Sequence, residues 1–109
     1  MKYKDIAPAL EAAGLPVTYY SWPETQAPDL PYLVWYLPGS DNMAADNRVY
    51  QKIDQLNVEL YTATKDFETE AAVEAALDAA GLVWEKTETY IDSEHMFEVL
   101  YEMEVLING

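Results

Sequence analysis

The sequence predicts an α+β fold: an antiparallel-dominated β-sheet with two helices packed on it and a long C-terminal β-hairpin. Two alanine-rich segments with helical spacing each end at a glycine, and segments rich in branched and aromatic residues lie between and after them. The last dozen residues largely alternate between apolar and acidic side chains, a pattern that fixes the register of a strand. With 109 residues, the chain is expected to form a single domain over 1–109, because two domains would each be too small to hold a core.

The first helix is expected over residues 3–13, where Tyr3, Ile6 and Leu10 recur at helical spacing. Gly14 tolerates the left-handed conformation that ends a helix, and a strand is expected to follow over 17–22. The seven residues that end this helix recur with one conservative change at the end of the second helix. Both helices are therefore expected to lead directly into a strand.

The middle of the chain begins with a fully apolar stretch. Residues 32–37 show no alternation, as in a strand covered on both faces, and Pro38-Gly39 is expected to end this strand. Residues 39–48 are small and polar, which predicts a mobile loop that becomes ordered only in an assembly.

The next strand is expected over 50–62, with alternate apolar residues on one buried face, and the second helix over 67–80. Asp66 is expected to cap this helix at its start and Gly81 to close it. The apolar residues expected to face the core are Leu56, Val58 and Leu60 of the strand, and Val73, Ala76, Leu77 and Ala80 of the helix, with Phe67 at the helix entrance.

The C-terminal segments predict a hairpin of strands 84–91 and 95–107, joined by a turn at 92–94. At ~3.4 Å per residue the second strand would be about 40 Å long, which exceeds the diameter of a compact domain of this size. Its second face also carries apolar residues. Two small helices cannot cover this surface as well, so we expect a neighbouring subunit to cover Met96, Leu100 and Leu106.

The charge of the chain excludes several classes of partner. There are 20 acidic and 6 basic residues, a formal net charge of −14. Binding of nucleic acid or of an anionic bilayer through a basic surface is therefore not expected. The absence of cysteine excludes disulfides, thiol nucleophiles and cysteine-ligated zinc. No signal-type or membrane-spanning apolar run is visible, which predicts a soluble protein made inside the cell.

No motif for catalysis stands out. The one histidine, His95, lies beside a predicted turn, where a solvated side chain is a better interpretation than a general base. The four glycines are too dispersed for a phosphate loop, and 20 acids are too many to single out a catalytic pair. An enzyme, a cofactor and a small-molecule substrate are therefore not expected. An enzyme remains an interpretation only if a cleft gathers carboxylates with strongly raised pKa values.

The polar loop supplies most of the candidate contact residues. Its Asp and Asn side chains offer oxygen ligands for a hard cation, but their order does not match a calcium loop, and no metal site is expected. Arg48, near the end of the loop, is the natural partner for an acidic side chain of another subunit, although an intramolecular or solvated arginine is the more common interpretation. The residues expected to contact a partner or another copy are Asp41, Asn42, Asp46, Asn47, Arg48, Met96 and Leu100.

The order of segments resembles a known family over nearly the whole chain. A short helix, a Tyr-rich strand and a Pro-rich bend lead to the strand Pro31-Tyr32-Leu33-Val34-Trp35-Tyr36. A polar loop with Ala45-Asp46-Asn47, the strand Leu56-Asn57-Val58-Glu59-Leu60-Tyr61-Thr62, a Glu/Ala helix and a terminal hairpin follow. This layout resembles the tail terminator, or tail completion, proteins of long-tailed phages and of the prophages of Gram-positive bacteria.

The resemblance implies a structural protein without catalytic residues. Proteins of this family have an α+β fold and assemble as a ring, commonly of six subunits, on the last ring of the tail-tube protein. The ring stops tube growth and presents a surface to the head-completion protein of the connector. The implied location is the head–tail junction of the virion, after synthesis in the cytoplasm of the host bacterium.

A nucleic-acid mimic is the alternative from another class. A strongly acidic domain could present carboxylates spaced like phosphates and so inhibit a host nucleic-acid-binding protein. Acidic surfaces also serve solubility alone, which weakens this interpretation. The acids that could form such a surface are Glu98, Glu102 and Glu104 on the last strand and Glu68, Glu70, Glu74 and Asp78 on the second helix.

Overall fold

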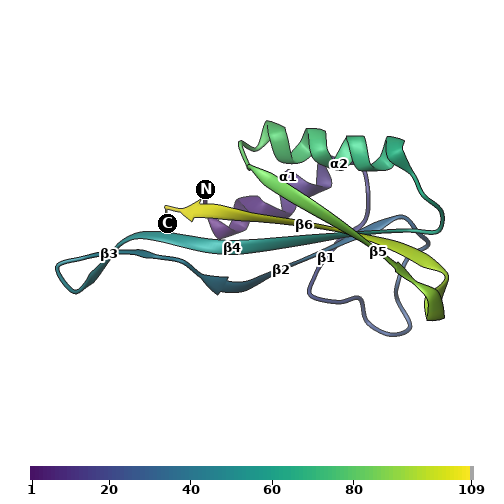
Figure 1. Ribbon diagram of the computed structural model, residues 1–109, viewed down its shortest axis with the longest axis horizontal. Coiled ribbons are helices and arrows are strands. Elements are labelled where there is room, and N and C mark those ends of the chain that lie inside the picture. The colour runs from purple at the N-terminus through teal and green to yellow at the C-terminus, as the bar shows by residue number, and fades with distance from the viewer. Residues whose placement is uncertain (109) are drawn as a thin grey trace.

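A computed structural model describes residues 1–108, and Gly109, the last residue of the expected single domain, lies outside them. Two helices lie on one face of a six-stranded sheet, which runs on well beyond them at one end (Figure 1). In chain order the elements are η1 (Tyr3–Asp5), α1 (Ile6–Glu11), β1 (Val17–Tyr19), β2 (Tyr32–Ser40), β3 (Met43–Ala45), β4 (Arg48–Thr62), α2 (Phe67–Ala79), β5 (Trp84–Ile91), η2 (Asp92–Glu94) and β6 (Met96–Ile107). The expected α+β class, with its C-terminal hairpin, is confirmed.

The sheet is built around one long antiparallel pair. Its strand order is β1-β2-β4-β6-β5, with β3 paired to β4 off this path. β1 runs parallel to β2, and the other pairings are antiparallel. β4 and β6 stay in one register from Lys52↔Ile107 to Thr62↔Phe97. The long strands give the molecule extents of 50 × 27 × 23 Å, in line with the predicted length of the last strand.

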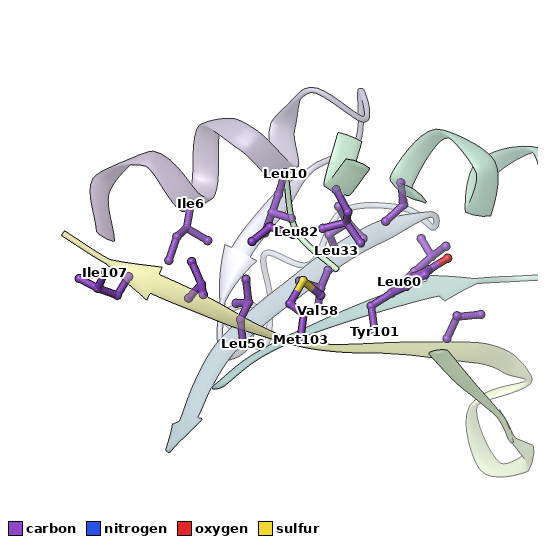
Figure 2. Close-up of a cluster of buried hydrophobic side chains, with 14 residues drawn as sticks. Ile6, Leu10, Leu33, Leu56, Val58, Leu60, Leu82, Tyr101, Met103 and Ile107 are labelled. Carbon is purple, nitrogen blue, oxygen red and sulfur yellow. The ribbon is translucent and has the colours of Figure 1, made fainter. Parts of the chain in front are cut away.

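The core lies between the two helices and one face of the sheet (Figure 2). The alternate residues of β4 and β6 that the sequence assigned to the buried face do lie there, and a slip of one residue would replace them by glutamates. The core side chains are Ile6, Leu10, Leu33, Leu56, Val58, Leu60, Val73, Leu77, Leu82, Val99, Tyr101, Met103, Val105 and Ile107.

The ends of the helices match the sequence prediction. Asp66 caps α2, because its Oδ1 accepts a hydrogen bond from the backbone N–H of Thr69 at 3.0 Å. Gly14 and Gly81 adopt positive φ angles of 83° and 75°, which only glycine adopts without strain. After Gly81, the N–H of Leu82 bonds back into the last turn of α2, and the chain turns directly into β5.

The first strand is shorter than the prediction of 17–22. β1 ends at Tyr19, because Tyr20 takes a left-handed φ of 69° and bends the chain away from β2. The connection to β2 passes the face of the sheet opposite the helices (Figure 1). There Trp22 packs edge-on against Tyr32, with ring centroids 5.8 Å apart. This packing explains why Val34 is buried as well as Leu33, as expected for a strand covered on both faces.

The entrance of the second helix differs from the prediction for Phe67. This side chain is 74% exposed, with the Lys65 ammonium 4.7 Å above its ring. The buried residue of the first turn is instead an acid, Glu70, which is 3% exposed. Its carboxylate lies 2.6 Å from Lys65 Nζ and 3.4 Å from Lys86 Nζ. Ion pairing from the loop before α2 and from β5 therefore offsets the desolvation of this carboxylate.

The prediction of a mobile loop over residues 39–48 is wrong. β2 continues to Ser40, and β3 then pairs with the start of β4. Pro38 does not end the strand because it falls at a bulge in the β2–β4 register, where its missing N–H is tolerated. Asp46 and Asn47 both have positive φ angles, of 53° and 59°, and form the two-residue turn that suits the twist of a hairpin.

We expect Glu70→Ala to lower the free energy of unfolding by about 2 kcal/mol, because it removes a buried carboxylate that forms ion pairs with Lys65 and Lys86. Glu68→Ala, at an exposed position of the same turn, is the matched control and should have little effect. Urea denaturation of both variants measures the difference. Equal stabilities would show that the buried ion pairs contribute nothing net.

Candidate functional site

The helices leave the opposite face of the sheet to the β1–β2 connection, which covers it only near β2, and we call this face the open face. Its side chains are those that alternate with the core residues along β4, β5 and β6. Most of them are acidic or polar, and this face carries five carboxylates. Its members on these strands are Ile53, Gln55, Asn57, Glu59, Tyr61, Glu85, Thr87, Thr89, Ile91, Met96, Glu98, Leu100, Glu102, Glu104 and Leu106.

Two carboxylates at the centre of the open face are half-buried. Tyr61 Oη donates a hydrogen bond to Glu98 Oε2 at 2.8 Å, while Glu59 sits beside them opposite Leu100. Burial, with the adjacent Glu98 carboxylate, raises the pKa of Glu59 to about 7. Burial and the same carboxylate also raise the pKa of Tyr61. Glu59 therefore carries a proton for part of the time at neutral pH.

A shallow groove lies on the open face near the start of β5, where β6 runs on past the edge strand. Glu85, Glu102 and Glu104 are exposed along it, and Val83 and Leu106 are exposed at its margins, Val83 by 86%. We call this feature the acidic groove. Its residues are Gln55, Asn57, Val83, Glu85, Glu102, Glu104 and Leu106.

The second surface feature is a two-stranded projection of residues 41–51, which we call the β-arm. It extends from the end of the sheet, past the helices (Figure 1). All but the last of its residues are exposed, including three large apolar ones: Met43, Val49 and Tyr50, with Tyr50 77% exposed. Such apolar exposure on a hairpin without a covering layer indicates a contact surface.

Five of the seven expected contact residues lie on the β-arm. Asp41 and Asn42 hold its base, where Asp41 N–H donates to the Ile53 carbonyl and Asn42 Oδ1 accepts from Ile53 N–H. Asp46 and Asn47 form its tip. Arg48 begins β4 opposite Ala45 and is exposed.

The other two expected contact residues lie apart from the β-arm and from each other. Leu100 is half-buried in the middle of the open face, and Met96 pairs with Ile91 at the opposite end of the sheet. The second face of β6 thus carries three acidic and three apolar residues, and Leu106 is its one strongly exposed apolar side chain. The sequence analysis missed Val49 and Tyr50, although two apolar residues directly after a polar segment are a readable signal.

The acids of α2 are largely engaged within the protein. Glu74 Oε2 accepts hydrogen bonds from Tyr101 Oη at 2.8 Å and from Lys86 Nζ at 2.7 Å. Asp78 accepts one from Trp84 Nε1 at 2.9 Å. Together with buried Glu70, these residues join α2 to β5 and β6, so the helix does not present a free row of carboxylates.

Few features of residues 1–108 are typical of a catalytic or metal-binding site. His95 lies exposed in the turn between β5 and β6, with a left-handed φ of 52°. Within residues 1–108, no group of three or more His, Asp or Glu side chains is placed to hold a metal ion. Over the same residues, no helix has the length and apolar character needed to span a membrane.

Comparison with known proteins identifies a likeness of fold. No protein-family model matches the sequence, and no curated protein matches it either. Among solved structures, a chain described as "Virion of native gene transfer agent (GTA) particle" is similar, with a TM-score of 0.57 and 17% sequence identity. The match covers 98% of this chain and 89% of that one. The two chains therefore share a fold over almost their whole length.

Glu59→Gln tests the half-buried carboxyl. The folded protein keeps a proton on Glu59 up to about pH 7, whereas a freely exposed Glu releases it near 4.5, so stability is lost as pH rises between these values. Glu59→Gln should lack this loss. Its free energy of unfolding at pH 8 should exceed that of the wild type by roughly 1 kcal/mol, after allowance for solvent screening.

Urea denaturation at pH 5 and pH 8 measures this effect. Glu104→Gln is the matched control, because it removes a charge from an exposed position of the same face. Parallel pH profiles for the wild type and Glu59→Gln would contradict the interpretation of a destabilised carboxylate.

Proposed function

We propose that this chain is a structural protein of a phage or phage-like particle. It caps the tail tube as a homo-oligomeric ring, stops tube polymerisation and joins the tube to the head-completion protein. The observation that carries the proposal is the fold shared over 98% of the chain with a chain of a gene transfer agent virion. The resemblance of the segment order to tail terminator proteins supports the narrower role.

The surfaces of the molecule suit a protein that works by contact. The helices bury one face of the sheet and leave the other free, and the β-arm carries apolar side chains away from the core. Neither feature stabilises the isolated subunit. Both are explained if neighbouring subunits, tail-tube protein and head-completion protein cover them in the particle.

The half-buried Glu59 does not require an enzymatic role. Its raised pKa follows from burial and from the adjacent Glu98 carboxylate on the surface of the sheet. A ring component needs no catalytic residue, cofactor, metal or small-molecule substrate, and none is proposed here. Its location is the head–tail junction of the virion.

A nucleic-acid mimic is the second candidate, favoured by the row of carboxylates on β6. Glu102 and Glu104 alternate along the strand at a spacing of ~6.8 Å and are exposed. However, Glu98 is bonded to Tyr61, and the acids of α2 are engaged with β5 and β6. Capture of a host nuclease or repressor in competition with duplex DNA would favour the mimic. Capture of tail-tube rings would favour the cap.

Assembly should respond to ionic strength. Subunits of net charge −14 repel one another, and salt or divalent cations screen this repulsion over a Debye length of about 10 Å at 0.1 M. We expect monomers or weak oligomers at low salt, and rings when salt, divalent cations or tail-tube protein are added. Analytical ultracentrifugation across ionic strength measures this. A sedimentation coefficient that stays unchanged, even with tube protein present, would contradict the proposal.

Replacement of residues 42–51 by a short glycine-containing turn should leave the subunit folded but block joining. The β-arm lies outside the core, so the midpoint of urea denaturation should change little. In the encoding phage, we expect heads and tails that accumulate unjoined, counted by electron microscopy. The control is Asp92→Ala with Glu94→Ala, in the exposed turn between β5 and β6. Normal particles from the arm-deleted variant would show that the arm has no role in joining.

A further inference from the structure

We propose that the β-arm of one copy docks into the acidic groove of the next copy and so makes the head-to-tail contact of the ring. This inference rests on the proposed function only for the existence of a ring. The contact itself is argued from three features of the molecule: unpaired positive charge at one end, unpaired negative charge in the groove, and exposed apolar residues beside both.

The six basic side chains fall into two groups, those that form ion pairs and those that do not. Lys65 and Lys86 form ion pairs with acids of α2 and β5. The other four bases form no ion pair within the described part of the chain, and all are exposed near the end from which the β-arm projects. They are Lys2 and Lys4 near the N-terminus, Lys52 on β4 and Arg48 on the β-arm itself.

The groove offers the opposite charge. Glu85, Glu102 and Glu104 are exposed there and make no ion pair within residues 1–108. Three carboxylates so close together repel one another, and a guanidinium placed among them would relieve this repulsion. Arg48 is the single arginine of the chain, and its planar group with five donors suits several carboxylates at once.

Exposed apolar residues lie beside the charges on both surfaces. On the β-arm, side chains alternate between the two faces of β4, so Tyr50, which is 77% exposed, shares the face of Arg48. In the groove, Val83 and Leu106, which are 86% and 56% exposed, lie with the carboxylates. A contact that places Arg48 among the glutamates therefore brings apolar side chains against apolar side chains, and buries surface that is otherwise in water.

Arg48 cannot reach the carboxylates in the groove of its own subunit. β4 is one continuous strand from Arg48 to Thr62, so Arg48 lies about 24 Å from Gln55 along it at ~3.4 Å per residue. Each copy thus presents one arm and one groove on separate parts of its surface. Such a contact is heterologous, because it joins different surfaces of the two copies. It generates a closed ring when the rotation from one copy to the next completes a full turn after a whole number of copies.

Charge reversal tests the contact at fixed ionic strength. Arg48→Glu, and separately Glu102→Arg with Glu104→Arg, should each weaken ring formation at least tenfold by sedimentation, whereas the combination of all three substitutions should restore rings. The matched controls are Lys4→Glu, at the same end of the molecule, and Asp92→Arg with Glu94→Arg, in the distant β5–β6 turn. Both controls should form rings. Rings from Arg48→Glu at wild-type strength would overturn the proposal.

Cross-linking gives an independent measure. The chain has no cysteine, so Tyr50→Cys and Leu106→Cys introduce unique thiols. In the ring, a short bismaleimide should join Tyr50→Cys of one copy to Leu106→Cys of the next and give a ladder that ends at the ring size, while either single variant stops at dimers. No ladder from wild-type-like rings would overturn the docking but leave the capping function standing. If the chain formed no ring even with tube protein, that result would contradict both the docking contact and the capping function.

Discussion

The single register between β4 and β6 is the constraint on which the rest of the structure depends. It aligns the alternate apolar residues of both strands on one face, where α1 and α2 cover them, and it places Tyr101 where its hydroxyl bonds to Glu74 of α2. A slip of one residue would carry Glu102 and Glu104 into the core, at the cost of burying unpaired charges. The helices, the polar contacts beneath α2 and the exposed acids of the other face all follow from this pairing.

The same register makes one face of the sheet form the core and leaves the other face available for contacts. The helix-covered face holds the core and, along α2 and β5, the ion pairs of Lys65 and Lys86. Within residues 1–108, the carboxylates of the open face form no ion pair, and Glu59 remains destabilised there when it is ionised. Evolution tolerates such unpaired or strained groups where a surface serves another molecule. The two faces of one sheet thus have different physical tasks.

A role in a particle agrees with this division. The likeness to a chain of a gene transfer agent virion extends over the whole fold and not over a local motif, and the features that set this subunit apart from a closed globule are its β-arm and its open face. In the proposed assembly, repulsion between acidic subunits would keep free copies apart, and the proposed contact between arm and groove would select one orientation.

The sequence by itself determined the fold class, the helix ends at Gly14 and Gly81, the cap at Asp66 and the inward faces of β4 and β6, because periodicity and local backbone preference act within a few residues. It could not determine that residues 39–48 form a hairpin, that Phe67 is exposed, or that Glu70 is buried between Lys65 and Lys86, because those outcomes depend on partners distant in the chain. The acidic groove likewise joins residues of three strands. Only the tertiary structure brings them together, since cross-strand neighbours are set by pairing and not by sequence order.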